Sequence, residues 1–320
     1  MEQDHRLSLE RIAEANRSID PVFRHTPQFV SEPLSDLLGL RLVVKIETLN
    51  PIRSFKGRGA DFFVQTLVAA GERGPIVCAS AGNFGQAMTY AARARGIPVI
   101  VYAAEAANPL KVDRMRALGA EVRQTGADFD AAKLAAKAYA ADHGLLMAED
   151  SLQPEFSEGA GTIGVELLTL PEPIDTLLIA LGNGAMLNGI ARWTKAHRPE
   201  IHTVGVAAAG APAMEHSWRA GEPITLDQMT TIADGIGVRV PVPEAVADMR
   251  GVVDDVLLVD DPAMLDAVRI SHRHLSLVLE PSGAAGLAAA MTFRDRFAGQ
   301  TVAVVLCGGN LTPEQMVAWL

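Results

Sequence analysis

The chain has 320 residues, of which 49% are hydrophobic, and its formal net charge is −10 at pH 7. At roughly 150 residues per domain, this length fits about two domains, and the apolar content supplies a large core, which excludes an intrinsically disordered chain. The acidic balance disfavours a nucleic-acid partner, because nucleic-acid binding requires a basic face.

Cysteine usage and hydropathy bear on the cellular compartment. The two cysteines, Cys78 and Cys307, are too few for a disulfide framework and favour a reducing environment. No run reaches the ~18 apolar residues of a membrane-spanning helix, and the charged N-terminal stretch lacks the apolar segment of a secretory signal. We therefore expect a cytoplasmic protein with no membrane partner.

Taken in chain order, the predicted elements begin with two helices. The first is a surface helix near the N-terminus, and its apolar side carries Leu7, Leu9, Ile12 and Ala13. The second is capped by Ser54 and ends at Gly71. Its apolar residues recur at the spacing of one buried stripe, namely Ala60, Phe63, Val64, Leu67 and Val68.

From residue 75 onward, short β-branched runs alternate with longer helical patterns. We predict strands at 75–80, 97–103, 121–126, 174–181, 202–208 and 301–306. We predict helices at 84–95, 108–119 and 129–144, and a further helix through Trp193. Residues 208–262 show a weaker, proline-containing pattern and are predicted to be rich in loops. The alternation predicts an α/β fold with parallel sheets covered by helices on both faces.

Three unusual turns occupy the same position relative to their strands. SAGN (80–83), GNGAM (182–186) and CGGN (307–310) each directly follow a predicted buried strand. Ligands of open parallel sheets bind just beyond the carboxyl ends of the strands. We therefore expect the three turns to form one site, or two sites that face each other.

A lysine with an unusual position lies in the stretch SFKGRGA, residues 54–60. Lys56 falls in the first turn of its helix, where the helix dipole disfavours an ammonium group, and burial would disfavour it further. A lysine that is neutral near pH 7 acts as a Schiff-base former and general base. For a lone lysine, the commoner interpretation is an exposed side chain with its head in water.

The stretch GNGAMLNG (182–189) is a candidate phosphate site, because glycines turn backbone N–H groups toward an anion at a helix N-terminus. A dinucleotide site is disfavoured, since Leu187 stands where the third glycine belongs and the next strand ends without an acid. A plain tight turn remains the alternative.

The stretch SAGNFGQ (80–86) also opens a helix and offers amides for a carboxylate; simple N-capping by Ser80 or Asn83 is the alternative. Cys78 is interpreted as a core residue, and Cys307 alone as a buried small hydrophobe. The eight histidines show no metal-ligand spacing, and those at 272–274 are expected on a helix surface.

Together with EPSGA (280–284), these motifs occur in the order SFKGRGA, SAGNFGQ, GNGAM, EPSGA, CGGN. In this order they resemble the fold-type-II pyridoxal-phosphate enzymes, which share a tryptophan synthase β-like fold with two open parallel-sheet domains. Within that group the resemblance is to the threonine/serine dehydratase and serine racemase branch, from about Arg24 to Asn310. We expect no C-terminal regulatory domain of the kind found in biosynthetic threonine dehydratases.

The resemblance implies a role for each motif. Lys56 would carry pyridoxal 5'-phosphate as a Schiff base, with Phe55 and Gly235 near the ring. Asn83 would hydrogen-bond the phenolic oxygen of the cofactor, and Cys307 would face its pyridine nitrogen. The phosphate would be held by Gly182, Asn183, Gly184, Ala185 and Met186. The substrate carboxylate would be surrounded by Ser80, Ala81, Gly82, Asn83 and Gly85.

The resemblance also implies a domain division and an assembly. Residues 1–72 and 150–320 would form a larger cofactor-binding domain, and residues 73–149 a smaller mobile domain that closes over a small amino-acid substrate. Closure would exclude water from the reacting carbon. A homodimer or homotetramer is expected.

The implied reaction is elimination of water from a 3-hydroxy amino acid, most simply L-threonine or L-serine, to give a 2-oxo acid and ammonia. Lys56 would remove the α-proton. A thiol, with an ordinary pKa of ~8.5, is a poor proton donor to the ring nitrogen and leaves a weaker electron sink, which favours loss of the β-hydroxyl over reprotonation. Racemases of this branch have a second serine where this chain has Ala81, so elimination is favoured.

Several alternatives stay open. Within the class they are a racemase, a 3-hydroxyaspartate dehydratase or a β-replacement enzyme; outside it, a non-catalytic ligand-binding protein. The chain also departs from the family pattern at Phe84, where histidine is frequent, and at Asn183 and Ala185, which replace glycines. Arg53 is expected at the surface, or else in the site, where it would select an acidic side chain. Ala209 stands where some members have a cation-binding glutamate, so no metal is expected.

Overall fold

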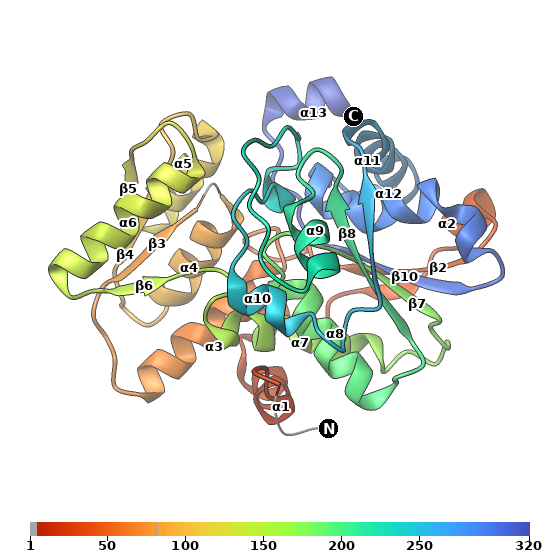
Figure 1. Cartoon of the computed structure of the whole chain (residues 1–320), viewed down its shortest axis with the longest axis horizontal. Helices are drawn as coiled ribbons and strands as arrows, with labels where there is room; N and C mark the ends of the chain where they lie inside the picture. The colour runs from red at the N-terminus through yellow and green to blue at the C-terminus, as the bar shows by residue number, and fades with distance from the viewer. Residues whose placement is uncertain (1–4, 81) are drawn as a thin grey trace.

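A computed structural model of the protein describes residues 5–80 and 82–320, and Figure 1 shows two β-sheets with helices around each. The larger sheet has six strands in the order β1-β2-β10-β7-β8-β9, and the smaller has four in the order β5-β4-β3-β6. The larger sheet contains β1 (Gln28–Val30), β2 (Arg41–Ile46), β7 (Thr176–Ala180), β8 (His202–Ala208), β9 (Asp255–Val259) and β10 (Thr301–Leu306). The smaller contains β3 (Ile76–Ala79), β4 (Val99–Ala103), β5 (Glu121–Gln124) and β6 (Leu146–Ala148).

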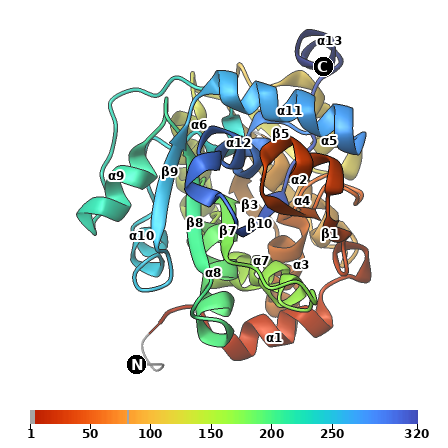
Figure 2. The ribbon, with the colours of Figure 1, turned by 90° about the vertical axis from the view of Figure 1, so that its right-hand side faces the viewer.

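Helices cover both faces of the larger sheet. Figure 2 shows α11 and α12 on one side of its strands and α7, α8 and α1 on the other. These helices are α1 (Leu9–Ser18), α7 (Pro154–Leu167), α8 (Ala185–His197), α11 (Asp261–Leu275) and α12 (Ala285–Thr292). Shorter helices complete this part, namely α2 (Glu32–Leu38), α9 (Ala213–Ala220), α10 (Pro243–Asp248) and α13 (Pro313–Trp319), with the 3₁₀ turns η1 (Pro21–Phe23), η2 (Asp234–Ile236), η3 (Pro281–Ala284) and η4 (Arg294–Phe297).

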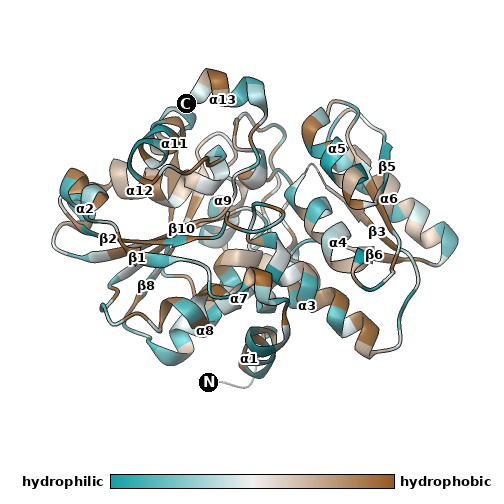
Figure 3. Ribbon diagram, turned by 180° about the vertical axis from the view of Figure 1, so that it is seen from behind, coloured by the Kyte–Doolittle hydropathy of each residue, from teal (hydrophilic) through white to brown (hydrophobic). Residues whose placement is uncertain are grey.

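Helices cover both faces of the smaller sheet. Successive residues of a strand point to opposite faces, so alternate residues of β3 pack with different helices. Ile76 and Cys78 of β3 pack with α4 (Asn83–Arg93) and α5 (Pro109–Leu118). Val77 and Ala79 pack with α6 (Phe129–His143). Figure 3 shows hydrophobic residues concentrated in the strands of both sheets. The predicted α/β class with parallel sheets is confirmed, as are all six predicted strands and the glycine stops at Gly119 and Gly144.

The structure corrects three expectations. The larger sheet is not wholly parallel, because β1 pairs with β2 in the antiparallel sense. The region 208–262 is rich in loops as predicted, although it also contains α9, α10 and the edge strand β9. In α1 the fully buried residues are Ile12 and Ala15, whereas Ala13 is half-buried and Leu7 precedes the helix.

The third correction concerns the second predicted helix, α3 (Lys56–Ala69). Residues 57–64 are all buried, so its first half has no exposed face and no single apolar stripe. The cause is its position between α4 and α7. The backbones of Gly59 and Gly159 approach so closely that a Cβ at Gly159 would lie 2.6 Å from the Gly59 Cα.

A buried cluster of charges fixes the start of α3 against the larger sheet. Arg58, with no exposed surface, lies 2.8 Å from Glu47 and 2.7 Å from Glu166. Lys45 on β2 lies 2.5 Å from Glu166 on α7. Burial alone would raise the pKa of Glu166, but hydrogen bonds and charge from Arg58 and Lys45 lower it to about 2. Each charge is therefore compensated, and loss of one partner is costly.

We expect Glu166→Gln to lower the free energy of unfolding by about 3–5 kcal/mol at pH 7, because it leaves Arg58 and Lys45 buried with too little negative charge. The depressed pKa of Glu166 gives stability that is present above its unfolded pKa of about 4.3 and is lost as pH falls toward about 2. Urea unfolding of the wild type between pH 6 and pH 2 should show this loss, whereas the variant should lack part of it. The exposed Glu72→Gln is the control; equal stability of both variants would contradict the assignment.

No helix in the described part of the chain is long and apolar enough to cross a membrane.

Candidate active site

The three turns at strand ends meet around one cavity of about 270 Å³, here called the central cavity. SAGN follows β3 of the smaller sheet, whereas GNGAM and CGGN follow β7 and β10 of the larger sheet. The cavity therefore lies where the carboxyl ends of strands from both sheets face each other. Its wall includes Ser80, Gly82, Asn83, Gly182, Asn183, Gly184, Ala185, Met186 and Cys307 from these turns.

Backbone hydrogen bonds tie CGGN to the start of α3. The Phe55 N–H donates to the Cys307 carbonyl at 3.1 Å, and the Gly309 N–H donates to the Arg53 carbonyl at 3.0 Å. The Asn310 side chain donates to the Asn83 Oδ1 at 2.8 Å, which links these segments to the turn after β3. The first turn of α3 is thus held at the centre of the site.

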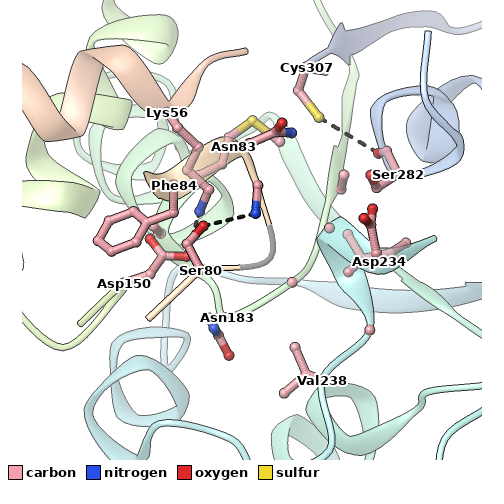
Figure 4. A pocket seen from close by; sticks show the side chains of 18 of the residues that line it. Lys56, Ser80, Asn83, Phe84, Asp150, Asn183, Asp234, Val238, Ser282 and Cys307 are labelled. Carbon is pink, nitrogen blue, oxygen red and sulfur yellow. Dashed lines mark hydrogen bonds and ion pairs between the residues drawn. The ribbon is translucent and has the colours of Figure 1, made fainter. Parts of the chain in front are cut away.

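Lys56 lies in the central cavity and is not a surface lysine (Figure 4). Its side chain is 17% exposed, and its Nζ donates to Asp150 Oδ2 at 2.5 Å. Nζ also lies 4.8 Å from the centroid of the Phe55 ring. Sequence reasoning missed Asp150, because no motif marks a carboxylate two residues beyond a short strand.

The turn after β7 has the features of an anion site. The amides of Gly182, Asn183 and Gly184 donate to no acceptor in the described part of the chain, and they precede the N-terminus of α8. Gly184 has φ +100°, and a Cβ at Gly182 would lie 2.7 Å from the Gly235 carbonyl oxygen. The Ala185 N–H differs, since it already donates to the Ser151 hydroxyl at 3.0 Å.

The turn after β3 is organised by Ser80. The Ser80 hydroxyl accepts hydrogen bonds from the N–H groups of Gly82, at 3.0 Å, and Gly85, at 2.8 Å. Gly85 does not line the cavity; it packs so closely that a Cβ would lie 2.3 Å from the Met115 Sδ. Its role is therefore packing, and Ala81 lies outside the described residues.

A cluster of polar side chains connects the two sheets across the cavity. Lys111 on α5 lies 2.5 Å from Asp234 on η2 and 3.6 Å from Glu280, and Asn83 donates to Glu280 through its Nδ2. Burial alone would lower the pKa of Lys111, but the charges of Glu280 and Asp234 raise it. Burial raises the pKa of Glu280. Because an amide NH₂ carries two hydrogens, Asn83 keeps one donor for a ligand.

Cys307 lines the cavity as a neutral thiol. Burial, followed by the negative charge of Glu280, raises its pKa to about 12. Its Sγ donates to the Ser282 carbonyl at 3.7 Å. Gly235 lies against Ser282, where a Cβ would meet the Ser282 Oγ at 2.6 Å. Cys78 is wholly buried in β3, as expected.

Arg53 is exposed and does not line the cavity, which leaves it at the surface. Phe84 lines the cavity and packs edge-on against Phe156. Among the described residues no group of three or more His, Cys, Asp or Glu side chains is placed to hold a metal ion. At the end of α11, His272 is exposed and His274 is half-buried.

Comparisons with known proteins match nearly the whole chain. The family described as pyridoxal-phosphate dependent enzyme matches residues 19–308. A putative threonine dehydratase of Sinorhizobium fredii is 31% identical over 95% of this chain and 92% of that protein. An L-threo-3-hydroxyaspartate ammonia-lyase of a Pseudomonas species is 29% identical over 98% of both. The structure of maize serine racemase has a TM-score of 0.90 at 29% identity, over 98% of this chain and 96% of that chain.

The chain belongs to the pyridoxal-phosphate dependent enzymes, and its cofactor is pyridoxal 5'-phosphate. Its fold is that of the fold-type-II members, and its relatives include threonine dehydratases and serine racemases, which confirms the branch indicated by the motifs. The central cavity fits this cofactor: unpartnered amides and a glycine cradle suit its phosphate, and a cavity lysine suits its aldehyde. Where each residue contacts the cofactor stays a prediction.

We expect Gly184→Ala to weaken the affinity for pyridoxal phosphate roughly tenfold or more. An alanine is strained at φ +100°, and its Cβ would lie 2.9 Å from the Asn188 Nδ2, so the turn must change shape. Gly119→Ala is the matched control, because Gly119 has φ +106° with nothing within 4 Å of the added Cβ. Titration of both apo-proteins with the cofactor measures the effect; equal affinities would count against a phosphate site at this turn.

Proposed function

We propose that this enzyme eliminates water from a neutral 3-hydroxy amino acid, L-threonine or L-serine, and releases a 2-oxo acid and ammonia. The charge balance of the central cavity carries the proposal. Its wall holds three carboxyl groups, on Asp150, Asp234 and Glu280, and two lysine side chains, Lys56 and Lys111. Both lysine Nζ atoms already lie 2.5 Å from a carboxyl oxygen.

This balance disfavours the 3-hydroxyaspartate alternative. A second substrate carboxylate requires a free cation, and the described residues of the wall offer none. Arg53, the candidate for that role, does not line the cavity. The same wall accepts a hydroxyl group at Cβ, since carboxylates and the Asn183 amide offer hydrogen-bond acceptors.

The residues of the cavity then take distinct tasks. When bound, pyridoxal phosphate supplies an electron sink for negative charge at the substrate Cα. The N-terminal turn of α4 and the donor groups of Ser80 and Asn83 orient the substrate carboxylate. The Lys56 Nζ takes the α-proton. As a neutral thiol, Cys307 would donate only weakly to the ring nitrogen of the bound cofactor, which would favour loss of the β-hydroxyl over return of a proton to Cα.

A mobile smaller domain, residues 73–149, would serve this chemistry by closing over the substrate. The separate four-stranded sheet of this segment supports the division, and two contacts cross between the segment and the rest of the chain. Lys111 pairs with Asp234, and Asp130 on α6 accepts a hydrogen bond from the Arg239 Nε at 2.8 Å. Both pairs join this segment to the loop at 221–242, at the mouth of the cavity. The cytoplasmic location and the homodimer or homotetramer stay predictions.

An assay of 2-oxo acid release tests the function directly. We expect activity with L-serine or L-threonine and at least about tenfold lower kcat/KM with 3-hydroxyaspartates, because the wall has no free cation for their second carboxylate. Lys56→Ala should abolish turnover, whereas Arg17→Ala, which removes an exposed cation on α1, should not change it. A preference for 3-hydroxyaspartate would overturn the substrate proposal. A wild-type protein that stays colourless with added cofactor would instead indicate a non-catalytic binding protein.

A racemase remains the nearest alternative activity, because one relative is a serine racemase. Racemisation needs an acid/base group on each face of the substrate, and Ala81, which lies outside the described residues, has no proton to give. We expect Ala81→Ser to gain D-serine formation from L-serine, measured by chiral chromatography. The wild type is the control, and no gain in the variant would count against this account.

A further inference from the structure

Asp150 stands out among the charged residues of the cavity because it contacts the lysine that the proposed reaction uses. It lies in the turn between β6 and α7, whereas Lys56 begins α3. The distance between Oδ2 and Nζ is 2.5 Å, and the side chains are 16% and 17% exposed. Figure 4 shows both side chains beside Ser80 in the same cavity. Neither residue motifs nor the family resemblance pointed to this carboxylate.

The carboxylate has no competing partner in the described part of the chain. Its second oxygen, Oδ1, is buried and makes no hydrogen bond to a described residue. Lys56 is therefore its one charged contact there. Asp234 and Glu280 differ from Asp150, because both of them lie near the same cation, Lys111.

The backbone on both sides of Asp150 is anchored, so its position is built into the fold. The preceding residue, Glu149, pairs with Lys133 and lies 2.7 Å from Lys137, both on α6. The following residue, Ser151, accepts a hydrogen bond from the Ala185 N–H at 3.0 Å. Asp150 thus sits between an anchor on the smaller sheet's helix and an anchor on the turn after β7.

We propose that Asp150 is a catalytic partner of Lys56 that stabilises the protonated Nζ during the reaction. This assignment rests on the proposed function, in which Lys56 takes the α-proton of the substrate. The substrate Cα–H bond breaks, its electron pair stays on the substrate, and the proton joins Nζ through the nitrogen lone pair. The combined charge of the Asp150 and Lys56 side chains then changes from −1 to zero. By the same contact, Asp150 would favour a protonated Nζ when the cofactor is linked to Lys56 in the resting enzyme.

Other titratable groups around the pair set the background for any pH measurement. They come from α5, η2, the segment before η3 and the turn after β10, and they are Lys111, Asp234, Glu280 and Cys307. Lys111 faces the two carboxylates among them, and Cys307 is a neutral thiol with a pKa of about 12. Asp150 is therefore the carboxylate whose charge acts on Nζ at hydrogen-bond distance.

The test compares the wild-type holoenzyme with Asp150→Asn, which keeps the shape and removes the charge, and Asp150→Glu, which keeps the charge. Asp266→Asn is the matched control, since Asp266 forms a surface pair with Arg269 on α11. The first readout needs no substrate: the pH midpoint at which the visible absorbance of the lysine-linked cofactor changes. We expect it to fall by about 1–3 pH units in Asp150→Asn and to stay unchanged in Asp266→Asn.

The second readout is kinetic. We expect kcat of Asp150→Asn to fall about 10²-fold with little change in KM, and Asp150→Glu to recover part of it. A wild-type midpoint and a wild-type kcat in Asp150→Asn would overturn the proposal. So would failure of both Asp150 variants to take up cofactor, because the residue would then be structural. A shifted midpoint in a protein that acts on none of the hydroxy amino acids would uphold the pairing and reject the proposed function.

Discussion

The site depends on one constraint: the N-terminus of α3 must lie buried at the junction of the two sheets. There Lys56 faces the carboxyl ends of β3, β7 and β10, which no single sheet could bring together. Hydrogen bonds from Phe55 and Gly309 join this helix start to the turn after β10. Two residues further on, Arg58 anchors the same helix turn in a cluster of compensated charges. The geometry at Lys56 therefore rests on interactions outside the cavity.

Charge compensation is the common principle of the core and of the cavity. In the core, Arg58 and Lys45 meet Glu47 and Glu166 without exposed cationic surface. In the cavity, Lys56 and Lys111 meet carboxylates in the same way, but their groups stay open to a ligand. The cost of burying these charges is therefore offset within the fold, both in the core and in the cavity.

The six predicted strands were found because they are buried runs that alternate with clear helical patterns. Four strands, β1, β2, β6 and β9, were missed. β1 and β6 have only three residues each and carry little periodicity, and β2 and β9 lie outside the stretches where strand and helix patterns alternate. The turn after β7 was found because its glycines are visible in the sequence. Glycine is needed there, since a side chain at Gly182 or Gly184 would collide with neighbouring atoms. Asp150, Lys111 and Asp234 could not be found, because each pairs with a residue far away in the sequence: 94 positions separate Asp150 from Lys56, and 123 separate Lys111 from Asp234.

The central claim is that Lys56, and no other lysine, carries the cofactor. Borohydride reduction of the holoenzyme fixes the link, and peptide mass mapping then locates the added mass. The account predicts that it lies on the peptide containing Lys56. Cofactor mass on Lys111, the other lysine of the cavity wall, or no covalent cofactor in a coloured holoenzyme, would contradict it.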